Sequence, residues 1–225
     1  MITAAEESAR ILPAVRTFAA FLASPFCPSP DAVISIDTFR ASVARAAIEA
    51  GAHVVNDVSA GLLDEEMLGT VAELGCTVVL MHMRGTPATM SSAENTSYPN
   101  GLIPTVAAEL LARVRAAEAA GIRRWRIILD PGIGFSKTQA QNLELLRRFE
   151  ELRNWEGLRG LPWLIGASRK GFIGKITGVK EARERTWGTA AVVAASVQAG
   201  ADVVRVHDVD EMVKVARMAD AIWRV

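Results

Sequence analysis

Polar and charged residues directly follow several apolar runs of the chain, and their types suit the binding of an anion or an electron-rich heterocycle. Ser168-Arg169-Lys170 comes after the apolar run 163–166 and is followed by Gly171. A guanidinium and an ammonium group beside a hydroxyl offer many hydrogen-bond donors at one place. Lys170 could instead be an ordinary surface lysine, but its neighbours favour a binding role.

A carboxylate and two glycines follow a second apolar run, residues 127–129. The sequence there is Asp130-Pro-Gly132-Ile-Gly134-Phe135. Glycines let the backbone approach a ligand closely, and Phe135 could stack on a ring. The alternative is an ordinary turn between a strand and a helix.

Two more apolar runs end in groups that could recognise the N–H edge of a flat ring. Asp37 follows Ile36, and Asn56-Asp57 follows Val55. A single aspartate in such a position often only caps the next helix, and this remains the alternative for Asp37 and Asp57. Several such groups on successive strands favour one ligand, because carboxylates form strong charge-assisted hydrogen bonds with an N–H-rich heterocycle.

The last apolar run carries an arginine and a histidine. Arg205 and His207 alternate along a strand predicted over Val203–Val206, so both side chains are expected to point the same way. This pair suits a diphosphate, whereas a lone histidine would more often be structural. Earlier in the chain, Met81 is interpreted as an apolar wall and His82 as a supporting residue.

These groups must be positioned by an alternation of short β-branched runs and longer helical patterns. The predicted strands are 33–37, 53–57, 77–81, 126–130, 163–166 and 203–206. The predicted helices are 6–23, 40–50, 64–74, 103–120, 141–154, 184–199 and 209–218. Glycines at 51, 75, 121 and 200 fit helix ends. Near-continuous apolar strands indicate a parallel sheet covered on both faces.

The strand count limits the fold class. About six strands are predicted, whereas a closed (β/α) barrel has eight, with its active site at the carboxyl ends of the strands. The sequence also starts on a helix. We therefore expect an α/β fold that is either an open sheet or a TIM-type (β/α) barrel lacking its first two strands.

Composition excludes several classes of protein. Among 225 residues, Lys+Arg and Asp+Glu are equal at 25 each, which argues against nucleic acid or an anionic membrane as a partner. Cys27 and Cys76 are too few for a disulfide framework or a thiolate metal site. The first residues do not resemble a secretory signal. No run is apolar enough for a membrane span.

Taken together, the motifs resemble the dihydropteroate synthase family. The resemblance covers nearly the whole chain, and stretches 80–90 and 123–145 are most similar to the C-terminal domain of the fungal multifunctional members. The motifs that carry it, in family order, are Ser35-Ile-Asp37-Thr, Val55-Asn56-Asp-Val, Leu80-Met81-His, Asp130-Pro-Gly, Ser168-Arg-Lys170 and Arg205-Val-His207-Asp.

The resemblance implies roles for individual residues. The residues that hold the pterin ring would be Asp37, Asn56, Asp130 and Lys170. The residues that line its pocket would be Met81, Phe135 and Gly166. Ser168 would help to place p-aminobenzoate, while Arg205 and His207 would hold the diphosphate. Asp130, Lys170 and Arg205 would also act in catalysis.

The implied reaction condenses 6-hydroxymethyl-7,8-dihydropterin diphosphate with p-aminobenzoate and releases pyrophosphate, with Mg²⁺ as cofactor. Family members begin with a strand and loop containing Asn-Val-Thr-Pro-Asp-Ser-Phe, whose Asn faces the metal, and neither this loop nor the next strand is present. No residue of this chain is therefore predicted to bind the metal. We expect residues 1–225 to be one pterin-binding domain, incomplete at its N-terminus, that can form a homodimer in the cytoplasm or the mitochondrion.

Two other interpretations remain open. One is a pterin-binding remnant without catalysis, or a fragment of an incomplete gene model. The other is a pterin-dependent methyltransferase, which would share the barrel and the carboxylates that bind the ring. The arginine and histidine near position 205 favour the synthase, because methyl transfer requires no diphosphate clamp.

Overall fold

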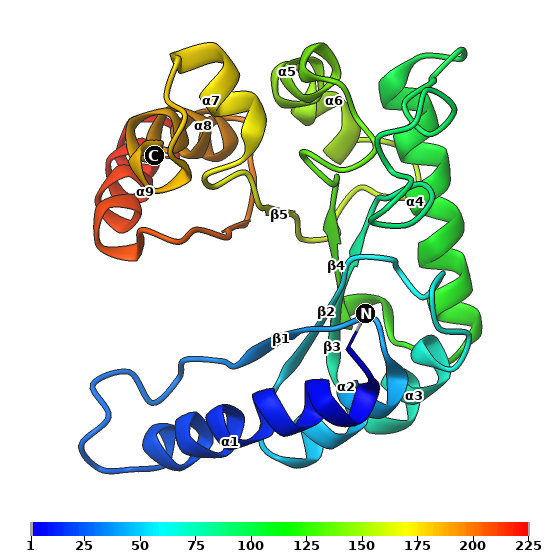
Figure 1. Ribbon diagram of the computed structural model, residues 1–225, viewed down its shortest axis with the longest axis vertical. Coiled ribbons are helices and arrows are strands. Elements are labelled where there is room, and N and C mark those ends of the chain that lie inside the picture. Colours follow the sequence, from blue (N-terminus) through cyan, green and yellow to red (C-terminus); the bar gives the residue numbers. More distant parts are fainter. Residues whose placement is uncertain (1, 225) are drawn as a thin grey trace. The chain divides into compact units, whose positions relative to one another are not determined.

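The computed structural model describes residues 2–224, which form two compact units with parallel strands (Figure 1). Among the described residues, the first unit comprises 2–81 and 112–128, and the second comprises 82–111 and 129–224. The α/β class and the parallel strands expected from the sequence are confirmed within the described part of the chain.

The strands are joined in sequence order. They are β1 (Ser35–Asp37), β2 (Val54–Asp57), β3 (Thr77–Met81), β4 (Ile127–Asp130), β5 (Leu164–Ile165) and β6 (Val203–Val204). The first four form one sheet in the order β1-β2-β3-β4, in which β1–β2 and β2–β3 are parallel. β5 pairs with β6, also in parallel, and a parallel bridge joins Leu129 to Trp163.

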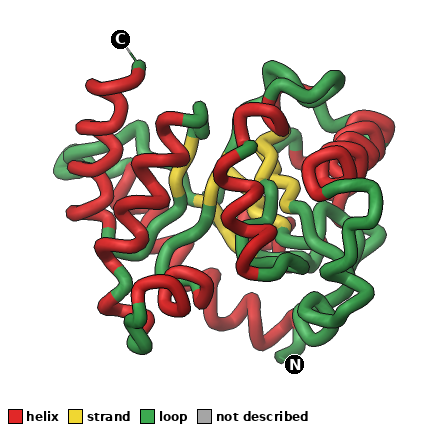
Figure 2. Tube along the Cα trace, turned by 90° about the horizontal axis from the view of Figure 1, so that it is seen from above, coloured by secondary structure: helices red, strands yellow, loops and turns green. Residues whose placement is uncertain are grey.

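The helices separate these strands, and Figure 2 shows that helices and loops make up most of the chain. They are α1 (Ala4–Leu22), α2 (Ala41–Glu49), α3 (Met67–Leu74), α4 (Leu102–Ala119), α5 (Gln139–Arg147), α6 (Phe149–Arg153), α7 (Gly171–Thr177), α8 (Thr186–Gln198) and α9 (Val209–Trp223). Two 3₁₀ turns lie at Arg124–Arg126 and Ala182–Glu184.

Local sequence signals set several of these boundaries. Thr3 and Glu6 form a capping box at the start of α1, and Thr138 and Gln141 form another at α5, so backbone donors at both helix starts are satisfied. The glycines expected at helix ends, 51, 75, 121 and 200, all have positive φ, as predicted.

Several predicted elements differ from those in the structure, among them the strand predicted over 33–37, which begins at Ser35, and the helix predicted over 209–218, which extends to Trp223. The single helix predicted over 141–154 is two helices, because Arg148 leaves the helical conformation at φ −109° and ψ 19°. The strand predicted over Val203–Val206 ends at Val204, so Arg205 lies in the following loop. The glycine-rich run after Lys170, for which no helix was predicted, forms α7.

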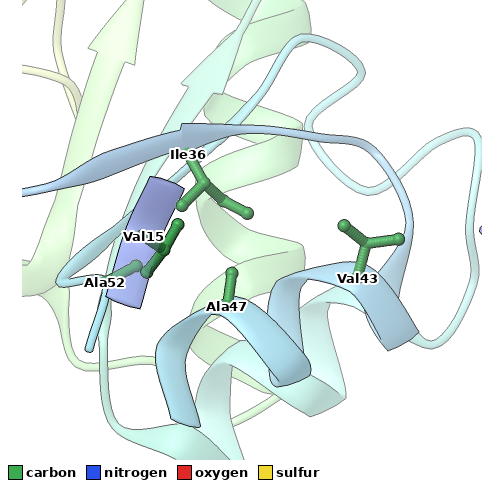
Figure 3. Close-up of a cluster of buried hydrophobic side chains, with 5 residues drawn as sticks. All are labelled: Val15, Ile36, Val43, Ala47 and Ala52. Carbon is green, nitrogen blue, oxygen red and sulfur yellow. The ribbon is translucent and has the colours of Figure 1, made fainter. Parts of the chain in front are cut away.

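Each unit has its own buried apolar side chains. In the first, Val15 of α1, Ile36 of β1, Val43 and Ala47 of α2, and Ala52 form a cluster (Figure 3). In the second, the fully buried rings of Phe149 and Trp163 meet edge to face at 5.4 Å between centroids. These packed layers fix the strands whose carboxyl ends carry the predicted site residues.

Candidate active site

The predicted site residues fall into two groups, one in each unit. Asp37, Asn56 and Met81 belong to the first unit. Asp130, Phe135, Gly166, Ser168, Lys170, Arg205 and His207 belong to the second.

In the first unit, strand register brings an acid and an amide together. Asp37 and Asn56 are direct partners in the β1–β2 ladder, and Asn56 is the partner of Val79 in β3. Residues two apart on a strand face the same side, so Met81 lies on the side of Val79 and Asn56. Register therefore places three predicted pterin residues on one face.

The Asn56 side chain has an unsatisfied group. It is 8% exposed, and its Oδ1 has no hydrogen-bond partner within the described chain. A buried amide oxygen without a donor is costly and calls for an explanation. A ligand N–H group would satisfy it. This observation supports the prediction that Asn56 contacts a ligand.

Asp57, the next residue, serves a different purpose. Its buried carboxylate accepts hydrogen bonds from the Ser59 amide at 2.8 Å, the Ser59 hydroxyl at 2.7 Å and the Gly61 amide at 2.6 Å. The alternative weighed for Asp57, a cap of the next helix, is not what the structure shows, because the N-cap of α3 is Glu66 and the partners of Asp57 lie in the preceding loop. Asp57 fixes a loop.

In the second unit, Asp130 is surrounded by cations. The side chain is 7% exposed, and its Oδ1 accepts a hydrogen bond from the Gly132 amide at 2.7 Å. Burial raises the pKa of Asp130, while the charges of Lys170, Lys137 and Arg205 act to lower it. These three cations therefore stabilise the ionised carboxylate.

Gly166 lies where the acidic and basic groups converge. A Cβ placed on Gly166 would be 3.8 Å from Asp130 Oδ2 and 3.9 Å from Arg205 Cβ. Lys170 Nζ donates to the Ile133 carbonyl and lies 4.6 Å from the centre of the Phe135 ring. The structure thus brings the predicted residues Asp130, Gly166 and Arg205 together, and Lys170 with Phe135.

Ser168 and His207 form a second contact within this unit. His207 Nδ1 lies 2.9 Å from Ser168 Oγ, and the His207 amide donates to the same oxygen at 3.2 Å. Ser168 is 8% exposed, whereas His207 is exposed. The two loops that carry the predicted p-aminobenzoate and diphosphate residues are therefore joined by these hydrogen bonds.

Arg169, the middle residue of Ser168-Arg169-Lys170, contacts other residues of its own unit and is not assigned an anion-binding role. Its guanidinium forms an ion pair with Asp208, and its backbone N–H donates to Thr189 Oγ1 at 3.2 Å. Arg169 also adopts φ of 61°, a conformation unusual for a side chain with a Cβ. Its ion pair with Asp208 links the loop that carries Ser168 to the loop that carries His207.

A cavity of about 380 Å³ lies next to Phe135 and Lys170. Its lining includes Gly134, Phe135, Lys170, Gly171 and Lys175. A volume of this size can hold a small heterocycle or an aromatic acid. The lysines give it a basic character that suits anionic groups.

Lys137 also lines this cavity and is a functional candidate that sequence reasoning missed. It is 8% exposed, which is rare for a lysine. Lys137 is the one charged residue in the run 131–137, and this was the only signal for it in the sequence.

The described residues do not by themselves fit Mg²⁺. Within 2–224, no cluster of three or more His, Cys, Asp or Glu side chains could hold a metal ion. The groups nearest Asp130 are cations, which disfavour a second cation. We therefore derive no step through the metal.

Within residues 2–224, no helix has both the length and the apolar character that crossing a membrane requires.

Comparison with known proteins shows the family of the chain. Residues 1–207 match the family described as pterin binding enzyme. The chain belongs to this family. It is 49% identical over 219 residues to the folic acid synthesis protein fol1 of Pneumocystis carinii. The aligned region covers 97% of this chain and 28% of that protein. It is 45% identical over 194 residues to the dihydropteroate synthase of Synechocystis, covering 86% of this chain and 65% of the relative.

Solved structures give the same result. The dihydropteroate synthase of Clostridium difficile, crystallised with pteroic acid, superposes with a TM-score of 0.88 at 34% identity, covering 100% of this chain and 77% of that one. The Xanthomonas albilineans enzyme in complex with 7,8-dihydropteroate gives 0.85 at 35% identity, covering 100% and 76%. The chain thus spans about a quarter of the fungal relative and about three quarters of these solved chains.

Proposed function

We propose that this chain acts in dihydropteroate synthesis, joining 6-hydroxymethyl-7,8-dihydropterin diphosphate to p-aminobenzoate with release of pyrophosphate. The observation that carries the proposal is the convergence of Asp130, Gly166 and Arg205, with Lys170 against Phe135. One carboxylate and two cations are the groups needed to bind a pterin that carries a diphosphate. Relatives and solved structures named dihydropteroate synthase support the reaction type.

The fold behind this function is proposed to be a TIM-type barrel. Parallel strands joined in sequence order, with polar residues after each strand, are the arrangement such barrels use. The solved synthases to which the chain is similar support this assignment.

Asp130 would recognise the ring and stabilise charge. Its carboxylate can accept hydrogen bonds from the N–H groups of a pterin. When the bond between the methylene carbon and the diphosphate oxygen breaks, positive charge develops on the pterin. A preorganised carboxylate in a buried site stabilises that charge where it forms.

Arg205 would stabilise the leaving group, whereas Lys170, which lies against Phe135, would hold the pterin ring. The diphosphate departs with the electron pair of the broken C–O bond, and nearby cations offset the negative charge that it gains. The amine of p-aminobenzoate then forms the new C–N bond and loses one proton. Ser168 and His207, joined by their hydrogen bond, are proposed to place p-aminobenzoate and the diphosphate.

Asp37, Asn56 and Met81 are also proposed to bind the pterin, on the geometry of their own unit. The support is their register and the unsatisfied oxygen of Asn56. Mg²⁺ is implied by the resemblance to the family, but the described residues offer no set of ligands for it, and the proposed mechanism assigns it no step. We also propose that the protein works in the cytoplasm or the mitochondrion and can pair with a second copy of itself.

The test has two parts. Calorimetry with 6-hydroxymethylpterin should show binding by the purified chain, and a pyrophosphate-release assay with both substrates and Mg²⁺ should show turnover. Binding without turnover would support the interpretation of a pterin-binding protein that lacks catalysis. Absence of pterin binding by the folded chain would contradict the proposal.

A further inference from the structure

Lys137 is buried at the end of the loop that follows β4, and its ammonium group has three partners. Nζ lies 3.1 Å from the Gly132 carbonyl oxygen, 3.0 Å from the Phe135 carbonyl oxygen and 2.9 Å from His82 Nδ1. An ammonium group has three N–H donors and no acceptor. The three contacts therefore match the charged form of this side chain.

The tautomer of His82 supports this assignment. His82 is 3% exposed, and its Nε2 lies 2.8 Å from Glu109 Oε2. Burial and the charge of Lys137 lower the pKa of His82 to about 4, so the ring is neutral at physiological pH. Because a carboxylate only accepts, Nε2 carries the proton and Nδ1 is left to accept from Lys137.

The carbonyls that Lys137 holds belong to the loop that shapes the proposed site. Gly132 donates its amide to Asp130, and Phe135 lies under Lys170. The Gly132 carbonyl also accepts the Phe135 amide at 3.0 Å, so the loop closes on itself around the Lys137 ammonium. Without the Lys137 amine, two carbonyls in a buried turn would lose a donor.

The outer side of the loop is fastened separately. Ser136 Oγ accepts the Arg84 amide and donates to the Arg84 carbonyl, both at 2.8 Å. The Tyr98 hydroxyl donates to the Ser136 carbonyl at 2.8 Å. These contacts hold the segment at Ser136, whereas Lys137 holds the part that carries Gly132 and Phe135.

We propose that Lys137 is a positioning residue that holds the Gly132–Phe135 turn in the shape that presents Asp130 and Phe135 to the pterin ring, and that only its charged form does so fully. This rests on the proposed function, because the ring is the ligand assumed for that turn. Lys137 acts through the turn and needs no contact with the reacting atoms.

The surroundings of Lys137 make its charge sensitive to pH. Burial lowers the pKa of Lys137 to about 7, an effect that the negative charges nearby reduce and the positive ones increase. The groups that face it from the packed elements are Asp130 at the end of β4, His82 and Arg84 after β3, Glu109 of α4 and Lys170 before α7. Near neutral pH the ammonium can lose its proton, and one of the three contacts then loses its donor.

The experiment compares pterin binding by the wild-type chain and Lys137→Met between pH 6 and pH 8.5. Calorimetry with 6-hydroxymethylpterin gives the two Kd values, and their ratio cancels any ionisation of the ligand. We expect the variant to bind about 30-fold more weakly at pH 6, as for lost hydrogen bonds to a charged group. The ratio should fall by about threefold or more at pH 8.5, where the wild type has lost the same charge. Lys214→Met, at an exposed lysine of α9, is the matched control and should give a ratio near one at every pH.

A ratio that is large but constant with pH would show a merely structural role and overturn the proposal. A ratio near one would do the same. If the wild type binds no pterin, the proposed function fails instead.

Amide hydrogen exchange in the unmodified protein provides a second measurement that requires neither a variant nor a ligand. The Gly132, Gly134 and Phe135 amides are hydrogen-bonded. Their protection factors, which already correct for intrinsic base catalysis, should fall about threefold or more between pH 6 and pH 8.5. Constant protection would show that the charge of Lys137 does not hold this turn. This result would stand even if Lys137→Met failed to fold.

Discussion

Asp57 and Asp130 both end a parallel strand in a buried position, yet their carboxylates have different neighbours. Asp57 is 0% exposed and accepts three hydrogen bonds from Ser59 and Gly61. Asp130 is 7% exposed and accepts one from Gly132. Burial raises the pKa of both groups.

The difference lies in what offsets the cost of burial. For Asp57 the largest opposing influences are hydrogen bonds from its own loop, with Arg113 further down in importance. For Asp130 the largest is the charge of Lys170. A carboxylate whose oxygens are used by its own loop stabilises the fold, whereas one held by surrounding cations can still accept hydrogen bonds from a ligand. The number and the donors of the hydrogen bonds that an aspartate accepts at a strand end therefore distinguish a structural role from a binding role.

Substitution of a glycine in the loop after Asp130 and in the loop after Asp57 should give the largest difference in the free energy of unfolding. Gly132 has φ of 71°, and a Cβ on it would lie 2.0 Å from the backbone oxygen of His82. Gly61 has φ of 76°, but its Cβ would meet the side chain of Leu68, which can rotate. We expect Gly132→Ala to lower the free energy of unfolding by about 4 kcal/mol and Gly61→Ala by about 2 kcal/mol.

Urea unfolding measures both values. Gly178→Ala is the control for backbone strain alone, since φ is 76° there and no atom lies within 4 Å of the added Cβ. It should cost about 1 kcal/mol. Equal losses for Gly132→Ala and Gly178→Ala would show that the contact with His82 relaxes easily and does not constrain the loop.

Substituting the two aspartates should separate binding from stability. Asp130→Asn should weaken pterin binding by about 3 kcal/mol, because a buried charged hydrogen bond is lost. Asp57→Asn should leave pterin affinity unchanged but lower the free energy of unfolding by about 2 kcal/mol, since an amide group would face donors of its own loop. Calorimetry and urea unfolding of both variants provide the test. Weaker pterin binding by Asp57→Asn would remove the distinction between the two carboxylates.

Acid should act in opposite directions on the aspartates and on His82. The pKa of buried His82 is about 4, below its ordinary value of 6.5, so the unfolded chain binds more protons between these pH values. Stability from this group is therefore lost as pH falls from 6.5 to 4, by about 3 kcal/mol in total. Asp57 and Asp130 have raised pKa values, so each contributes more stability as pH falls toward 3.8.

Glu109 adds a further loss of stability at pH values below those at which His82 titrates. Burial opposes ionisation of Glu109, but hydrogen bonds from His82 and Arg84 lower its pKa to about 2. Urea unfolding at pH 7, 5.5 and 4 should show a steeper acid loss in the wild type than in His82→Gln. Parallel curves for the two proteins would mean that His82 does not titrate in this range.

Much of the scaffold could be predicted from the sequence because its signals are local. β3 was predicted with its exact ends, and glycines with positive φ marked the helix ends. Asp130, Lys170 and Arg205 were predicted as site residues because each lies at or shortly after the end of an apolar run. A parallel sheet brings such positions to one edge regardless of loop details.

What could not be predicted depends on contacts distant in sequence. The burial of Lys137 requires His82, which lies 55 residues earlier. The role of Arg169 depends on Asp208, 39 residues later, and a triplet read in isolation suggests three equivalent ligand-binding groups. Asp57 and Asn56 are adjacent, and only the hydrogen bonds of the folded loop assign one to structure and leave the other with an unsatisfied oxygen.

The smallest effects should distinguish the cations that act around Asp130. Lys170 contacts the Phe135 ring and the Ile133 carbonyl, both in the loop proposed to hold the pterin. Arg205 is exposed and lies beside Gly166, in the loop that also carries His207. We expect Lys170→Ala to weaken binding of 6-hydroxymethylpterin by about tenfold and Arg205→Ala by about twofold, whereas Arg205→Ala should weaken binding of the diphosphate form by about tenfold or more. Competition titrations with both ligands at fixed ionic strength measure these ratios, and Lys214→Ala serves as the control for a lost surface charge. If both variants lose the same factor on both ligands, the cations act only through the overall field at Asp130. If the two variants instead lose affinity for the two ligands by different factors, the cations around Asp130 contact different parts of the substrate. Asp57, whose carboxylate is held by hydrogen bonds from its own loop, has no such set of cations to distinguish parts of a ligand.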